Sequence, residues 1–160
     1  MATIHIETGQ VGGIPILTMK PEGIRNQPAV LFVHGFGHDK QQGLSLGYEV
    51  ASRGMNFIAL DAPMHGDRFD PHLERVAAGE ADLVYPAGTG LDTFFLMHEV
   101  IVQTARDITE LIDHFQTDPA VDAGAVGLTG FSMGGFATFY AVAVEKRIQA
   151  AVPMAGVPAF

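Results

Sequence analysis

Short runs of consecutive apolar residues, separated by stretches with a helical pattern, are the feature that most limits what this chain can fold into. The runs cover residues 29–33, 57–60, 125–128 and 150–154. A strand that faces solvent on one side alternates apolar with polar residues, so runs without alternation are typical of strands buried on both faces. Such strands, alternating with helices, predict an α/β fold with a mostly parallel sheet and helices on both of its faces.

Helical patterns occupy three of the stretches between the runs, residues 39–54, 92–115 and 133–144. The last of them is apolar nearly all round, which predicts a central, buried helix. The first twenty residues alternate around glycines instead, and this pattern predicts an antiparallel hairpin through which the chain enters the sheet. Residues 63–90 have no clean period and many glycines and prolines, so we expect a long excursion over the carboxyl edge of the sheet, where such folds bind ligands.

The composition fits one domain, residues 1–160, and argues against several classes of function. Hydrophobic residues make up 48% of the chain, enough for a packed core, and the net charge of −9 without any cluster of Lys or Arg disfavours nucleic acid and anionic membranes as partners. The absence of cysteine excludes thiolate metal sites and a cysteine nucleophile. Because the chain shows neither a signal-peptide pattern nor an apolar stretch of roughly 18 residues, we expect a soluble, cytoplasmic protein.

A five-residue motif connects the run at 125–128 to the helical stretch that begins at Met133. It reads Gly130-Phe131-Ser132-Met133-Gly134, which is the G-x-S-x-G pattern of a nucleophile elbow in the strand-to-helix context that this motif needs. The serine of such an elbow lies on a strained turn, and the flanking glycines remove side chains that would collide with the neighbouring strand and helix. Taken alone, the motif also fits a helix that simply begins with a capping serine.

Two further motifs follow the first two apolar runs. The run at 29–33 is followed by His34-Gly35-Phe36-Gly37, where an oxyanion loop of the H-G-G-G kind belongs, and the run at 57–60 is followed by Asp61-Ala62-Pro63-Met64-His65-Gly66-Asp67-Arg68. The three motifs together resemble the α/β-hydrolase family, in particular its dienelactone-hydrolase-like and prolyl-oligopeptidase-like esterases. The resemblance extends from about Ile14 to the end of the chain.

The resemblance implies a serine hydrolase that cleaves small-molecule carboxylic esters without a metal or other cofactor. Ser132 would be the nucleophile, held between Gly130 and Gly134, and the backbone N–H groups of Phe36 and Met133 would form the oxyanion hole. The remaining motif residues would have supporting roles: His34 and Gly35 in shaping the oxyanion loop, Asp61 and His65 in the neighbouring turn, and Arg68 in either anchoring the excursion or contacting substrate.

The sequence departs from the family pattern after Ser132. The family's acid and histidine follow the nucleophile, but the 28 residues after Ser132 contain neither His nor Asp. Glu145 is the sole carboxylate among them, and 13 residues of helix would place it about 20 Å from Ser132. We therefore expect the acid and the base outside this chain, which resembles the front two-thirds of a hydrolase truncated after the sixth strand. A missing C-terminal segment or a second copy is expected to cover the apolar strand at 150–154.

Other interpretations have weaker support. His34 or His65 acting as the base does not match the family pattern, and a metal held by His34, His38, Asp39, Asp61 and His65 is disfavoured because glycines break the loop. A dinucleotide site is excluded, since Lys40 stands where the third glycine of the fingerprint belongs. The remaining alternative is a non-catalytic fragment or degenerate hydrolase scaffold. A reading frame that continues past Phe160 with an Asp and then a His would decide against it.

Overall fold

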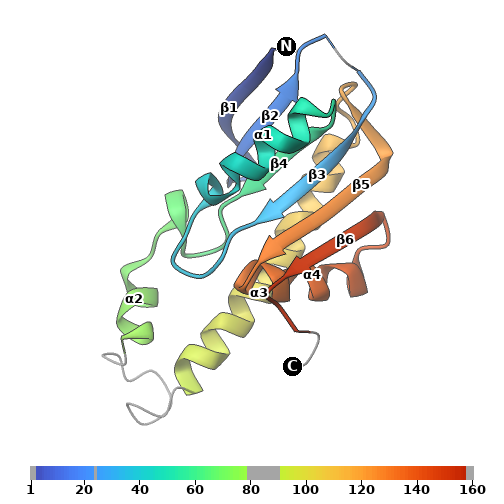
Figure 1. Cartoon of the computed structure of the whole chain (residues 1–160). Helices are drawn as coiled ribbons and strands as arrows, with labels where there is room; N and C mark the ends of the chain where they lie inside the picture. Colours follow the sequence, from blue (N-terminus) through green and yellow to red (C-terminus); the bar gives the residue numbers. More distant parts are fainter. Residues whose placement is uncertain (1–2, 24, 79–90, 158–160) are drawn as a thin grey trace.

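The residues described by the computed structural model, 3–23, 25–78 and 91–157, form a six-stranded sheet covered by helices (Figure 1). The strands are Ile4–Val11 (β1), Ile14–Pro21 (β2), Gln27–Val33 (β3), Asn56–Leu60 (β4), Val121–Phe131 (β5) and Ile148–Met154 (β6). The α-helices are Leu44–Ser52 (α1), Pro71–Ala77 (α2), Leu91–Phe115 (α3) and Met133–Val144 (α4), and the 3₁₀ helices are Lys40–Gly43 (η1) and Gly66–Arg68 (η2). None of the helices in these ranges is long and apolar enough to cross a membrane.

The sheet has the order β1-β2-β4-β3-β5-β6. β1 pairs with β2, and β2 with β4, in antiparallel orientation, while β4, β3, β5 and β6 run parallel to one another. The predicted α/β architecture, with a mostly parallel sheet entered through an antiparallel hairpin, is therefore confirmed. The hairpin predicted within the first twenty residues is formed by β1 and β2.

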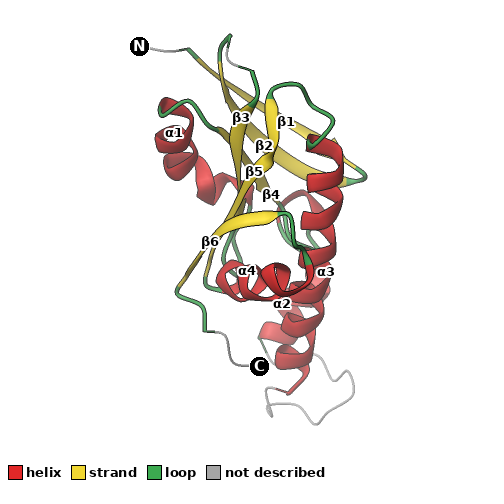
Figure 2. Ribbon diagram, turned by 90° about the vertical axis from the view of Figure 1, so that its right-hand side faces the viewer, coloured by secondary structure: helices red, strands yellow, loops and turns green. Residues whose placement is uncertain are grey.

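Helices cover both faces of the sheet, α1 on one side and α3 with α4 on the other (Figure 2). Successive residues of the central strands therefore enter different cores. Leu31 and Ile58 pack in the core under α3 and α4, while their neighbours Phe32 and Phe57 pack in the core under α1. Because each strand buries both of its faces, the apolar runs of β3 and β4 contain no polar alternation.

Two helical stretches differ from the prediction. Residues 39–54 form η1 followed by α1 rather than one helix, and Gly47 lies where α1 packs so closely on the sheet that a Cβ would be 2.5 Å from the Phe57 ring. The helix α4 is buried on one face only, and Val144 at its end is 58% exposed. The apolar composition of α4 predicted a core helix. In the structure α4 packs against the sheet and against α3 with one face, and its other face is uncovered within the described part of the chain.

The outer parts of the chain also differ from the prediction. The excursion at 63–90 contains η2 and the short helix α2, for which Asp70 caps the N-terminus and Pro71 is the first residue; residues 79–90 lie outside the described part of the chain. The strand β5 begins at Val121, ahead of its apolar run. Within the described residues β6 is an edge strand paired with β5 alone, and Val152 is 60% exposed. An uncovered apolar strand at the edge is what the sequence led us to expect of these residues taken alone.

Candidate active site at the carboxyl edge of the sheet

The three motifs meet at one edge of the sheet because the strands that precede them end in register. Val33, the last residue of β3, pairs with Leu60 at the end of β4 and with Gly130 of β5. The carboxyl ends of adjacent parallel strands lie side by side, so the segments that follow β4, β3 and β5 are neighbours.

Ser132 lies in the turn between β5 and α4 with φ 52° and ψ −111°, a left-handed φ that is uncommon for a residue with a side chain. Its N–H donates to the carbonyl of Met154 at 2.8 Å, and its carbonyl accepts from the N–H of Phe136 at 3.1 Å. These bonds to β6 and α4 hold the turn in its strained conformation, with the Ser132 side chain partly exposed.

The glycines on either side of Ser132 allow backbone to approach backbone. A Cβ on Gly130 would overlap the carbonyl of Gly134. One on Gly134 would overlap the carbonyl of Val33 and lie 2.8 Å from that of His34. The glycine spacing of the motif is thus explained by the packing of α4 against the ends of β3 and β5.

This packing predicts the effect of adding one methyl group. We expect Gly134→Ala to lower the free energy of unfolding by about 3 kcal/mol or more, because the new Cβ meets backbone atoms that cannot rotate away. The matched control is Gly9→Ala, whose Cβ would have no neighbour within 4 Å and should leave stability nearly unchanged. Urea denaturation of both variants compares them, and equal stability would contradict the packing argument.

His34 is completely buried and uses both ring nitrogens. Its Nδ1 lies 2.7 Å from the carbonyl of Gly35, and its Nε2 accepts from the N–H of Ala62 at 3.0 Å. This pairing assigns the proton to Nδ1, because Nε2 acts as an acceptor. Burial lowers the pKa of His34 to about 4. The imidazole is therefore neutral near pH 7 and joins the loop after β3 to the loop after β4.

Phe36 lies in the loop after β3, half-buried, with its ring edge-to-face against His65 at 5.4 Å between centroids. The same loop is held by a bond from the N–H of Gly35 to Oε1 of Gln42 at 2.7 Å. A Cβ on Gly35 would lie 3.5 Å from the carbonyl of Phe131, so this loop runs beside the Ser132 turn. On the other side of the turn, Met133 is the first residue of α4, where an N–H has no acceptor within the helix.

Asp61 is the centre of a buried charge network. Its carboxylate accepts from the backbone N–H of Lys40 at 2.8 Å, from Nζ of Lys40 at 2.7 Å and from the N–H of Asp67 at 2.9 Å. The Lys40 ammonium also donates to Asp67 at 2.8 Å, and bonds to both carboxylates raise the pKa of Lys40 although burial opposes this. The network joins the end of the loop that carries Phe36 to the turn after β4.

Arg68 anchors the start of the excursion to the long helix α3. Its Nη1 donates to Oδ2 of Asp107 at 2.5 Å and to the carbonyl of Asp61 at 3.2 Å. Asp107 is buried and also accepts from Gln103 at 2.9 Å. Of the two roles expected for Arg68, the structure therefore provides the anchor to a carboxylate.

His65 is 3% exposed, and its Nδ1 lies 2.7 Å from the carbonyl of Pro63, which accepts a hydrogen bond from it. Its Nε2 is buried and has no hydrogen-bond partner among the described residues. Burial lowers the pKa of His65, which favours the neutral ring. Because its free nitrogen is closed off from solvent, this conformation of His65 does not offer a proton acceptor to a substrate.

Glu145, the sole carboxylate after Ser132 in this chain, ends α4 at the opposite end from Ser132. It forms two hydrogen bonds with the Arg147 guanidinium, at 2.9 and 2.6 Å, and these bonds lower the pKa of Glu145 to about 2. Arg147 also donates to Asp113 of α3 at 2.6 Å. Glu145 is thus a structural ion-pair partner between α4 and α3, as its spacing from Ser132 indicated.

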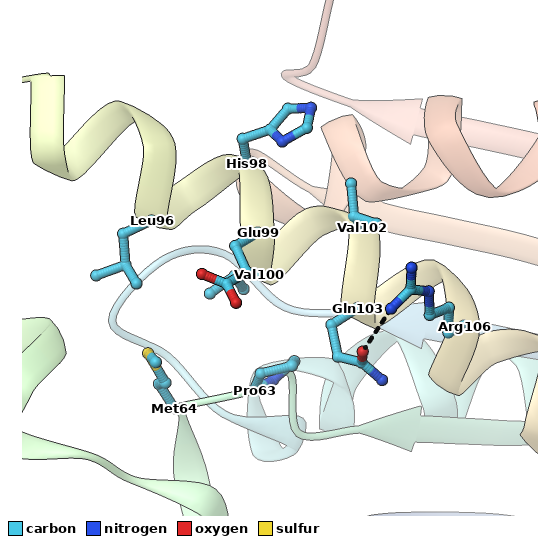
Figure 3. A pocket seen from close by; sticks show the side chains of 9 residues that line it. All are labelled: Pro63, Met64, Leu96, His98, Glu99, Val100, Val102, Gln103 and Arg106. Carbon is cyan, nitrogen blue, oxygen red and sulfur yellow. Dashed lines mark hydrogen bonds between the residues drawn. The ribbon is translucent and has the colours of Figure 1, made fainter.

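Two cavities flank the Pro63-Met64 turn, which has Met64 at φ 63°. One, of about 400 Å³, lies against α3, where the Glu99, Gln103 and Arg106 side chains face the turn (Figure 3). The other, of about 430 Å³, lies between Phe36, the turn and α2, and we call it the α2 cavity. Sequence reasoning placed ligand binding in this region without locating either cavity.

Sequence reasoning missed three charged residues of this region: Lys40, Asp67 as a partner of Lys40, and Asp107. Lys40 is 21 residues from Asp61, and Asp107 is 39 residues from Arg68. Pairs so distant in the sequence leave no spacing signal. The one clue in the sequence was the position of Lys40, directly after the expected oxyanion loop. Because lysine is seldom buried, this position did not favour a buried ion pair.

Comparison with known proteins supports the fold described above. A family model described as "Alpha/beta hydrolase family" matches residues 30–159. The solved structure of a "Putative Dienelactone Hydrolase" from Klebsiella pneumoniae subsp. pneumoniae MGH 78578 superposes with a TM-score of 0.71 at 20% identity, over 96% of this chain and 60% of that one.

Two curated relatives are similar over almost the whole chain. "Putative esterase YitV" of Bacillus subtilis (strain 168) is 30% identical over 157 residues, which are 97% of this chain and 55% of the relative. "Esterase YjfP" of Escherichia coli (strain K12) is 24% identical over 155 residues, 96% of this chain and 55% of the relative. The chain thus spans about half the length of these relatives.

Proposed function

Because this chain belongs to the alpha/beta hydrolase family, we propose that it is the nucleophile-bearing part of a serine hydrolase that cleaves carboxylic esters. The observation that carries the proposal is the position of Ser132, in a left-handed turn at the carboxyl edge of the sheet, held by glycine packing. A serine in this position presents its hydroxyl at the start of a helix, where backbone N–H groups favour developing negative charge. The esterase names of YitV and YjfP support the same class of reaction.

In the proposed reaction, Oγ of Ser132 attacks the carbonyl carbon of the ester while a general base takes the hydroxyl proton. The carbonyl oxygen becomes an oxyanion that accepts hydrogen bonds from the N–H groups of Phe36 and Met133. Collapse of this intermediate expels the alcohol, which takes the proton from the base, and leaves an acyl group on Ser132. Water then repeats the sequence, releasing the acid and restoring the serine.

We propose that the base and its acid come from polypeptide outside these 160 residues. His34 has both nitrogens engaged, the free nitrogen of His65 is closed off, and Glu145 lies at the wrong end of α4. The matched relatives are nearly twice as long as this chain, which supports a further segment as the source. Such a segment, or a second copy, would also cover the exposed edge at β6.

A fluorophosphonate probe tests the proposal, because it reacts with serines activated by a base. We expect the polypeptide of the complete reading frame to be labelled at Ser132, as located by peptide mass spectrometry. Ser45 and Ser52 are the other serines of this chain and serve as internal controls that should stay unlabelled. Labelling that is slow, spread over all three serines or unchanged by heat denaturation would contradict an activated nucleophile.

A second prediction concerns the oxyanion hole. Phe36→Pro removes the N–H that we assign to the oxyanion, so we expect kcat to fall by roughly 100-fold, corresponding to about 3 kcal/mol. Phe36→Leu keeps the N–H and should change the preference among acyl groups more than kcat for the best substrate. Steady-state hydrolysis of p-nitrophenyl esters compares the two, with circular dichroism showing that both are folded. Equal rates for folded Pro and Leu variants would rule out the assigned donor.

A further inference from the structure

The α2 cavity is placed to contact the part of a substrate next to the reacting carbonyl. Phe36 contributes its side chain to the wall of this cavity, while its backbone N–H is the donor that we assign to the oxyanion. A group that enters the α2 cavity therefore contacts the residue that we assign to the oxyanion hole. This inference rests on the proposed function for its chemistry, whereas binding in the cavity can be tested without turnover.

The wall of the cavity is mostly apolar and is held by a small core of its own. Its apolar lining includes Phe36, Met64, Phe69 and Leu73. Leu73 also packs with the buried residues of α2 and α3 and against Phe36 and Met64. These contacts hold α2, which forms the outer wall, in place relative to the loops that carry Phe36 and Met64. The cavity volume of about 430 Å³ lies toward the lower end of the range for small-molecule pockets.

The charges around the α2 cavity disfavour a negative ligand. Glu74, His38 and His65 are the titratable residues that line the cavity, and no Lys or Arg is among its described lining residues. The two cations of the adjacent loops are already paired, Lys40 with Asp61 and Asp67, and Arg68 with Asp107. Glu74 and Arg75 are both exposed residues of α2, and of the two only Glu74 is part of the lining. While these histidines are neutral, a carboxylate in this cavity would lose water and gain no cationic partner.

We infer that the α2 cavity receives the acyl group of the ester and selects uncharged, mainly apolar acyl groups over those that carry a carboxylate. The apolar wall supplies the binding free energy through burial, and Glu74 supplies the discrimination through repulsion. Ester substrates of this protein are then compact and neutral on the acyl side.

The absence of Trp from the chain provides a direct binding assay. Phe69→Trp, combined with Ser132→Ala to prevent turnover, places the single tryptophan of this chain in the cavity wall, at a position 55% exposed in the wild type. Phe94→Trp in the same background is the matched control, since Phe94 is 54% exposed and is not a lining residue. The probes are ethyl benzoate, monoethyl terephthalate, which adds a carboxylate, and diethyl terephthalate, which adds size without charge.

The measurement is made at pH 8, where histidine is mostly neutral. We expect ethyl benzoate and diethyl terephthalate to change the tryptophan emission of the Phe69→Trp variant along a saturable binding curve. Monoethyl terephthalate should bind roughly tenfold more weakly. Glu74→Lys should reduce this difference by roughly threefold or more, and Glu7→Lys, the same charge change on exposed β1, should not. Equal binding of all three probes, an equal effect of Glu7→Lys, or the same response from the Phe94→Trp control would overturn the inference.

The outcome is separable from that of the proposed function. Selective binding in the α2 cavity without fluorophosphonate labelling at Ser132 would retain the binding site and reject the hydrolase mechanism. Labelling at Ser132 with no saturable binding in the cavity would retain the mechanism and reject this acyl site.

Discussion

Ser132→Ala is expected to reduce ester hydrolysis by roughly 10³-fold or more, because the reaction then has no nucleophile and only oxyanion stabilisation and binding remain. The measurement is kcat for p-nitrophenyl acetate and butyrate, made on the polypeptide encoded by the complete reading frame. KM should change little, since the hydroxyl contributes mainly to the transition state. The fold should be kept, because the described contacts of Ser132 to β6 and α4 are made by its backbone.

The control variant is Ser52→Ala, at an exposed position of α1, where the hydroxyl donates to the backbone carbonyl of Glu49 in the same helix. It should hydrolyse both esters at the wild-type rate. If Ser132→Ala retained activity within a few-fold of wild type, the nucleophile assignment would be wrong. If the complete polypeptide had no activity on any ester and no labelled serine, the non-catalytic scaffold would be the better interpretation.

Lys40→Met is expected to destabilise the fold by about 3–5 kcal/mol, as usual when one member of a buried ion pair is removed. The side chain of Lys40 is 6% exposed and that of Asp61 is not exposed at all, so methionine would leave the Asp61 carboxylate buried without its cation. For a domain of this length, each kcal/mol corresponds to about 2–4 °C in Tm. Urea denaturation and thermal melting followed by circular dichroism measure the loss.

Two variants separate the ion pair from the general effect of losing a lysine. Lys146→Met removes an exposed lysine that contacts only a backbone carbonyl of α4, so stability should change by no more than about 0.5 kcal/mol. Lys40→Met combined with Asp61→Asn removes the unpaired charge and should recover part of the loss. A double variant less stable than the sum of the two single variants would contradict the proposed coupling.

The comparison of β3 with β6 shows how far an apolar run can predict structure. In both strands the run correctly indicated a strand, because consecutive apolar residues suit a pleated segment within a sheet. Only β3 is buried on both faces, while β6 lies at the edge of the described sheet with Val152 exposed. Burial depends on which strands and helices lie next to a segment, and that information is not local.

The sequence by itself predicted the turns and loops that form the candidate site. The strained turn at Ser132, the glycines around it and the loop with His34 and Phe36 depend on residues within a few positions of one another, so local geometry and sterics were sufficient to predict them. Their common location followed as well, because parallel strands buried on both faces bring their carboxyl ends to one edge of the sheet.

Only the tertiary structure decided how the surrounding loops are held and what space they enclose. Lys40, after β3, reaches Asp61 at the end of the adjacent strand β4, Arg68 reaches Asp107 on α3, and α2 closes a cavity over Phe36. Each of these contacts joins residues that are distant in the sequence, and its existence depends on the order β4-β3-β5 and on the path of the excursion. Charges and cavities act through space, so their partners could be identified only after the chain had been placed in three dimensions.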